Sequence, residues 1–297
     1  MSLIAGNTNW VLFLAADGEP ENRHVQDITF GVFCLESAGV SPKNINIYID
    51  GQDRALINSL ISIGTTNLYN IKPTNEFFAD CKRNHYDNLM LFVTGHGSLS
   101  GIDAAPPITP CVLLTALKSC PGLQQSVVFL GQCFAGTFNY IGAGKKRGRE
   151  AHENDPEIIF IGATNLHPSL SLSTKENLPA GEMAWLANVF LLHVFKWLSN
   201  PFDVDGDGKV TVIDAYKYAG VMSNQINHTF KVQSFSTAVA MHPQWDAART
   251  AHLAQNTLQT LLAFQAINTV YYNNLSNNYT HQECWILNAV PAQFIEA

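Results

Sequence analysis

Two stretches of this chain decide its fold: Leu91-Phe-Val-Thr-Gly-His96-Gly-Ser and Val127-Val-Phe-Leu-Gly-Gln-Cys133-Phe-Ala-Gly136. Each begins as a short apolar run and ends in a glycine-flanked residue with a reactive side chain. Short, continuous apolar runs are typical of strands that are buried on both faces of a parallel sheet. Ligands of such sheets bind beyond the carboxyl ends of the strands, so we expect His96 and Cys133 to project into one site.

The surrounding sequence alternates between apolar strands and helices. Strands are expected at 10–16, 45–49, 88–94, 126–130 and 157–163. Helical spacing of apolar residues predicts helices at 25–38, 53–62, 74–83, 110–119 and 183–198. A strand, a helix and a second strand in this order predict a right-handed crossover and a parallel pair. The sequence therefore predicts an α/β fold, a three-layer α/β/α sandwich with a mostly parallel central sheet.

Composition narrows the class of protein. The chain has 297 residues, of which 46% are hydrophobic and 14% charged, as in a globular protein with a large core. A net charge of -7, with only 145–149 locally basic, argues against a nucleic-acid partner. The N-terminal residues lack a signal-peptide pattern, and no run of about 18 apolar residues follows. We therefore expect a cytoplasmic protein with no membrane partner.

The six cysteines show neither CxxC spacing nor a dense framework, so neither a zinc site nor a disulfide scaffold is expected. Five of them are interpreted as buried or bystander thiols, and Cys133 has a different setting. An isolated cysteine or histidine is most often structural. A thiol beside an imidazole, however, is a strong nucleophile at neutral pH, and the amides of Gly97 and Cys133 are candidates to hold the oxyanion of an acyl transfer.

With these residues the sequence resembles the clan CD cysteine peptidases, which include caspases and legumains. Members carry His-Gly after one apolar strand and a later cysteine after another, and here 133 - 96 = 37 residues separate the two. The string Gln132-Cys133-x-x-Gly136 is similar to the caspase motif, with one residue fewer between Gln and Cys. The resemblance implies a caspase-like fold and a cysteine endopeptidase with a protein or peptide substrate, in which Cys133 and His96 are catalytic.

Residues 21–45 look like the legumain segment that follows the first strand. The resemblance places Arg23 in the pocket for the substrate side chain before the scissile bond; the alternative is that Arg23 braces its loop. The third catalytic residue of legumains, an Asn, falls on Glu21, with Asn22 and Asp17 as other candidates. Glu182 is similar to an acidic pocket residue of legumains, which with Arg23 implies selection of Asn or Asp. A solvent-exposed Glu182 at a helix start is the alternative.

A second motif lies at 203–214, Asp-Val-Asp-Gly-Asp-Gly-Lys-Val-Thr-Val-Ile-Asp. Oxygen donors stand where the calcium loop of an EF-hand has them, from side chains of Asp203, Asp205, Asp207, Thr211 and Asp214 and from the carbonyl of Lys209. The sequence therefore predicts a Ca2+ site, with affinity altered by Asp rather than Glu at the last position. The alternative is a degenerate loop that caps the following helix. Some prokaryotic caspase-like proteins have a similar loop before a final strand, which 236–242 resembles here.

The resemblance thus places the peptidase domain, with its calcium-type loop, at 1–246 and leaves 247–297 as a C-terminal extension without an assigned role. Glycine and charge without apolar periodicity make 141–156 an exposed linker, where caspases are processed. Cleavage there, or an activating ligand or partner at the C-terminal segment, would restrain the enzyme. The alternatives to an endopeptidase are a transamidase or peptide ligase of the same clan, and a calcium-binding scaffold protein with an inactive dyad.

Overall fold

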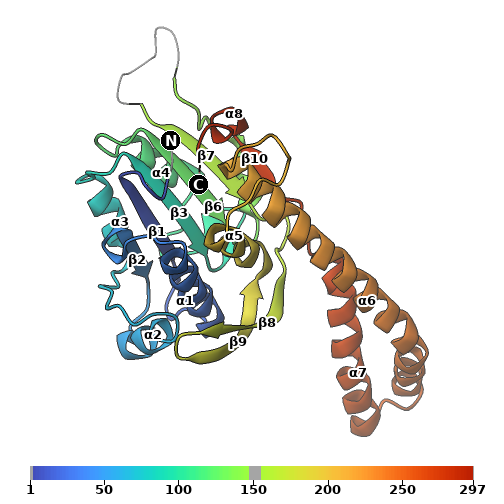
Figure 1. Ribbon diagram of the computed structural model, residues 1–297. Helices are drawn as coiled ribbons and strands as arrows, with labels where there is room; N and C mark the ends of the chain where they lie inside the picture. The colour runs from blue at the N-terminus through green and yellow to red at the C-terminus, as the bar shows by residue number, and fades with distance from the viewer. Residues whose placement is uncertain (1–2, 147–154, 297) are drawn as a thin grey trace. The chain divides into compact units, whose positions relative to one another are not determined.

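A computed structural model describes residues 3–146 and 155–296 of the chain (Figure 1). Its centre is a six-stranded sheet with the order β10-β7-β6-β3-β1-β2. The strands are β1 (Thr8–Leu14), β2 (Ile45–Ile49), β3 (Asn88–Thr94), β6 (Gln125–Leu130), β7 (Glu157–Gly162) and β10 (Trp285–Leu287). All neighbouring pairs are parallel except β10 with β7. The predicted α/β class with a mostly parallel sheet is confirmed, and the arrangement is consistent with a caspase-like fold.

Helices cover both faces of this sheet, which explains why its central strands are apolar throughout. On one face α1 (Asn22–Ser37), α2 (Arg54–Ile61) and α5 (Val189–Ser199) bury residues of β1 such as Leu12 and Leu14. On the other face α3 (Thr74–Cys81) and α4 (Pro110–Lys118) pack against the alternate residues Val11 and Phe13. Each such side chain contributes about 1.5–3 kcal/mol through burial. The sheet edge that carries the reactive residues is therefore rigidly held.

The helix predicted at 183–198 is wrong in its first half. The chain forms an antiparallel hairpin of β8 (Ser171–Leu178) and β9 (Gly181–Asn188), and α5 begins only at Val189. Burial alternates along β9, where Met183, Trp185 and Ala187 are buried. Apolar residues on the exposed face of β9 hide this alternation in the sequence. Asn188 ends the strand and caps α5, because its side-chain oxygen accepts a hydrogen bond from Leu191 N at 3.0 Å.

The chain divides into two compact units. The first comprises Met1–Ser223 and Gln282–Ala297, and the second Asn224–His281. The expected division at 246/247 differs from this because it falls inside α6 (Val212–Gln255). Residues 282–297 belong with the sheet: β10 extends it beside β7, and the Trp285 indole donates to the carbonyl of Thr164 at 2.9 Å.

The second unit is a helical hairpin made of the later part of α6 and α7 (Leu258–Ser276). The strand expected at 236–242 is helical instead. His242, the last residue of this stretch, contacts α7: its Nδ1 lies 2.9 Å from the hydroxyl oxygen of Tyr271. Just after the stretch, the Trp245 indole donates to Asn268 at 2.9 Å and stacks on Tyr271. These contacts join residues 23 to 29 positions apart, so the local pattern of 236–242 does not reveal them.

The short elements are η1 (Pro42–Asn44), β4 (Gly97–Ser98), β5 (Gly101–Ile102), η2 (Ala135–Tyr140), η4 (Asn277–Tyr279) and α8 (Ala289–Ala292). Within the described chain, no helix has the length and apolar character needed to cross a membrane.

Candidate active site

The fold brings His96 and Cys133 to the same edge of the sheet. β3 and β6 are neighbours with Val93 paired to Leu130, so the two residues follow adjacent strand ends. Gly95 permits the turn after β3 with a φ of +114°, a conformation that favours glycine. A Cβ atom on Gly97 would lie 2.4 Å from the carbonyl oxygen of Cys133. The loop that carries the histidine therefore touches the loop that carries the cysteine, and only glycine fits at the contact.

Glu21 holds the imidazole of His96. Its Oε1 atom lies 2.6 Å from His96 Nε2. A carboxylate only accepts hydrogen bonds, so Nε2 carries the proton and Nδ1 is the basic nitrogen of the neutral ring. Glu21 stands at the start of α1, where the amide dipoles favour an anion. Of the three residues suggested by the sequence for the third catalytic position, Glu21 is the one that the structure places on His96.

Arg23 binds the second oxygen of the Glu21 carboxylate. Its Nε donates to Glu21 Oε2 at 2.6 Å, and this bond with the charge of Arg23 lowers the pKa of Glu21 to about 2. Glu21 therefore remains an anion throughout the neutral range. The Nη1 atom of Arg23 donates to Ser171 Oγ at 3.0 Å. Arg23 thus lies between the residue that holds the His96 imidazole and the first residue of β8.

The surroundings of Cys133 come from the segment before β8. Ser169 N donates to Cys133 Sγ at 3.3 Å, and Ser169 Oγ donates to the carbonyl of Gly131 at 3.1 Å. Phe134 has a φ of 55°, which turns the chain sharply after the cysteine. Because Ser169 contacts Cys133 and Ser171 contacts Arg23, one short segment joins the thiol to the guanidinium. Nothing in the sequence pattern around 169–171 predicts this role.

A buried carboxylate, Asp27, connects the chain segments next to His96 and Cys133. Its Oδ1 accepts hydrogen bonds from Trp185 Nε1 at 2.9 Å and from Asn188 N at 3.1 Å, and its Oδ2 accepts one from Thr94 Oγ1 at 2.8 Å. Asn188 in turn donates to the carbonyl of Gly131 at 2.6 Å. Burial raises the pKa of Asp27 to about 6. This network ties the strand that bears His96 to the loop that bears Cys133.

The structure does not bring Glu182 to Arg23. Glu182 is paired with Asn177 near the turn of the β8–β9 hairpin, whereas Ser171, the partner of Arg23, is paired with Asn188 at the other end. The side chain of Glu182 is 53% exposed and forms an ion pair with Lys175 at 3.2 Å. The residue is on a strand rather than at a helix start, so neither of its two expected placements is observed.

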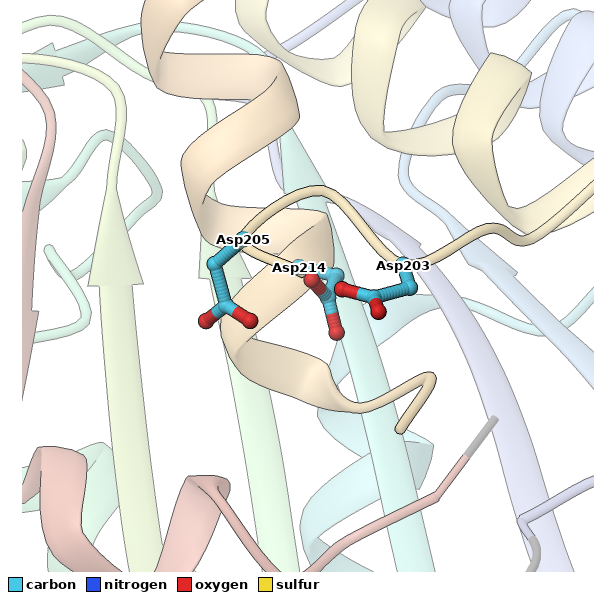
Figure 2. A group of neighbouring side chains, drawn as sticks. All are labelled: Asp203, Asp205 and Asp214. Atoms are coloured by element: carbon cyan, nitrogen blue, oxygen red, sulfur yellow. The ribbon is translucent and has the colours of Figure 1, made fainter. Parts of the chain in front are cut away.

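The loop at 203–214 gathers acidic oxygens before and at the start of α6 (Figure 2). One carboxylate oxygen from each of Asp203, Asp205 and Asp214 lies within 4.8 Å of the others. Oxygens that share one Ca2+ at 2.3–2.6 Å are at most about 5 Å apart, so these three fit the ion. Asp207 is not in this group, the Thr211 hydroxyl donates to Asp214 at 3.3 Å, and the ammonium of Lys217 binds Asp205.

Comparisons with known proteins add little to this geometry. No protein-family model matches the chain, and no curated protein matches it. One similar solved structure is the X-ray structure of a secreted C11 cysteine protease from Bacteroides thetaiotaomicron in complex with an irreversible peptide inhibitor. The identity is 11% and the TM-score 0.36, over 76% of this chain and 60% of that chain. The chain spans less than two thirds of that protease, and so weak a likeness carries no argument about activity.

Proposed function

We propose that this protein is a cysteine endopeptidase in which Cys133 is the nucleophile and His96 the general base and acid. The observation that carries the proposal is the meeting of two strand ends, one with Cys133 and one with an imidazole held by Glu21 at 2.6 Å. A histidine that is oriented by a carboxylate and adjoins a thiol is the arrangement that activates nucleophiles in acyl transfer.

The proposed reaction has two steps. Nδ1 of His96 takes the proton of the thiol as Cys133 Sγ attacks the scissile carbonyl, and the amides of Gly97 and Cys133 hold the oxyanion. The C–N bond then breaks, the proton passes to the leaving amine, and a thioester remains on Cys133. In the second step His96 takes a proton from water, which attacks the thioester and releases the acid and the free thiol. Glu21 keeps the imidazole in the required tautomer throughout.

Arg23 supports an Asn- or Asp-directed specificity on the acyl side. Its guanidinium binds Ser171, two residues from the serine that contacts Cys133, so one short segment links it to the thiol. Its charge is already paired with Glu21, which favours a substrate group that accepts hydrogen bonds, such as an amide or a carboxylate. Glu182 is left out of this pocket because of its place at the far end of the hairpin.

A cysteine-directed covalent peptide probe tests the proposal. The wild-type protein should be labelled at Cys133 and should cleave peptide substrates, whereas Cys133→Ala should lose both properties. Cys111, which is exposed whereas Cys133 is half-buried, provides the control, and Cys111→Ala should be labelled at Cys133 like the wild type. Labelling of Cys133→Ala equal to that of the wild type, together with no cleavage by either, would favour a scaffold with an inactive dyad. Products extended by an added amine would favour a transamidase.

We further propose that the 203–214 loop binds Ca2+ through Asp203, Asp205 and Asp214. The close approach of their oxygens supports this, and the loop spacing adds the carbonyl of Lys209 and the side chains of Asp207 and Thr211 as expected ligands. Hydrogen bonds from Gly206 N and Gly208 N to the Asp203 carboxylate stabilise the turn of the loop. The bound ion would supply structural stability to the start of α6.

Calcium titration calorimetry checks this site, with Mg2+ as the comparison ion. Asp205→Asn should weaken Ca2+ binding by about tenfold, because it removes one anionic ligand. Lys217→Met should tighten binding severalfold, because the ammonium of Lys217 competes with the ion for Asp205. Absence of binding to the wild type, or equal affinity in all three proteins, would contradict the proposal.

We also propose that the enzyme acts in the cytoplasm, without nucleic-acid or membrane partners, and is restrained by processing in the 141–156 linker or by a ligand or partner of the C-terminal segment. Residues 147–154 of that linker lie outside the described part of the chain. The linker's described ends are anchored: Lys145 N donates to Glu157 at 3.0 Å, and Lys118 pairs with Asp155 at 2.9 Å. A cut between these anchors would leave both strand ends in place.

A further inference from the structure

A cavity lies at the edge of the sheet that carries Cys133 and His96. It has a volume of about 530 Å³ and is lined by residues that follow β1 and β2, such as Ala16 and Gly51. β6, β3, β1 and β2 are consecutive strands of the sheet. Along this edge Cys133 therefore comes first, His96 second and the cavity third, with His96 between the thiol and the cavity.

This cavity has an apolar wall within a lining that also contains polar residues. Phe78 of α3, Val112 of α4 and the run Pro106-Pro107-Ile108 form its wall. Its base is held by Asp50, whose carboxylate accepts hydrogen bonds from Ala16 N at 3.2 Å and from Thr74 N at 2.8 Å. A preformed cavity of this size with an apolar wall suits an aliphatic or aromatic side chain.

A second cavity lies beside His96 and shares a lining residue with the first. It has a volume of about 230 Å³ and is lined by His96, His24, Glu21 and Ala16 among others. Ala16 lines both cavities, and the neighbouring residues Asp103 and Ala104 line one each. The two cavities are therefore neighbours: along the strand order the cavity at His96 comes first after Cys133, and the 530 Å³ cavity lies beyond it.

Resting on the proposed function, the geometry points to a binding site for the leaving-group half of the substrate: we propose that the 530 Å³ cavity receives an apolar side chain located C-terminal to the scissile bond. The same histidine must protonate the leaving amine. The part of the peptide that carries this amine therefore lies on the His96 side of the thiol. Arg23 and Ser169 are assigned to the acyl side by their contacts with Ser171 and Cys133. β2 lies two strand spacings of about 4.8 Å, or about 10 Å, from β3. An extended peptide, which rises about 3.3 Å per residue, covers this distance in about three residues. The side chain is therefore about the third after the scissile bond.

Two kinds of substrate with the same acyl part test the proposal. One ends in a fluorogenic amide and has no residues after the scissile bond. The other is an internally quenched peptide that continues with Gly-Gly and then Leu or Ser. The wild type should cleave the Leu peptide with a kcat/KM about tenfold higher than the Ser peptide, as expected when an apolar side chain fills an apolar pocket. Equal values would overturn the proposal.

The variant Val112→Asp places a charge in the cavity wall at a side chain that is already 47% exposed. It should lower kcat/KM about tenfold for the Leu peptide and leave the fluorogenic amide unchanged. Leu56→Asp, at a similarly exposed position of α2 (41%), is the matched control and should change neither. An equal loss on both substrates would indicate structural damage and overturn the assignment.

Failure of the proposed function would be recognised separately, because the fluorogenic amide would then not be cleaved at all. In that event the uncleaved Leu and Ser peptides are compared for binding to Cys133→Ala by fluorescence anisotropy. Tighter binding of the Leu peptide that is lost in Cys133→Ala with Val112→Asp would still support the site. Equal affinity would overturn it.

Discussion

Glu21→Gln should lower kcat/KM by about 100-fold, because the imidazole of His96 then loses the acceptor that fixes its tautomer. An amide presents either its oxygen or its NH2 group to Nε2, and the second choice moves the proton to Nδ1, where the base is needed. The pKa of about 2 keeps Glu21 ionised at any working pH, so this carboxylate should not titrate in the neutral-pH activity profile. The loss is measured with the fluorogenic amide between pH 6 and 8.

Glu182→Gln is the matched control for this experiment. Both glutamates are half exposed, at 51% and 53%, and both form an ion pair, but only Glu21 touches His96. Glu182→Gln should retain wild-type kcat/KM and the same preference between Asn and Asp. Glu21→Gln should in addition shift the preference toward Asp, since it frees the charge of Arg23. Equal losses in the two variants would contradict the assignment of Glu21.

The central sheet could be predicted because its strands are buried on both faces. Runs such as 88–94 are buried along their whole length, and β3 pairs with β6, the next strand of the central sheet along the chain. The same logic places His96 and Cys133 at one edge, since each directly follows such a run. Local spacing and burial suffice for this part of the site.

The rest depends on contacts that local pattern does not contain. The hairpin at 171–188 has apolar residues on its exposed face, so β9 looks like the start of a helix. Ser169 and Asn188 acquire their roles only because that hairpin returns to Gly131. The resemblance to legumains implies a pocket role for Glu182, but the hairpin places this residue near its turn, at the end away from Ser171. Sequence distance, rather than residue type, limits what could be predicted here.

Asp27 should make the protein less stable as the pH rises from 4 to 7. Burial raises its pKa to about 6 from an ordinary value near 3.8, so the folded state holds the proton more tightly than the unfolded chain does. Its contribution to stability is therefore full below about pH 4 and is lost as the pH rises through 6. The difference of about 2 pH units corresponds to about 3 kcal/mol. Asp27→Asn, which does not titrate, should lack this component.

Urea unfolding of the two proteins at several pH values measures this effect, because other groups titrate alike in both and cancel in the difference. The unfolding free energy of Asp27→Asn relative to the wild type should rise by about 3 kcal/mol between pH 4 and pH 7. Parallel pH curves would show that Asp27 does not have a raised pKa in the folded protein.

Asp27→Ala separates the charge of this residue from its hydrogen bonds. It leaves Trp185 Nε1, Asn188 N and Thr94 Oγ1 without their acceptor. At about 1–3 kcal/mol for each unsatisfied buried group, partly relieved by water, the cost relative to Asp27→Asn, which likewise does not titrate, should be about 3–5 kcal/mol at every pH. Because Thr94 and Asn188 adjoin the two catalytic loops, kcat should fall in the protein that still folds, whereas Asp27→Asn, with an oxygen in the same place, should retain most of it. Equal activity of the two variants would mean that the network stabilises the fold without positioning the catalytic pair.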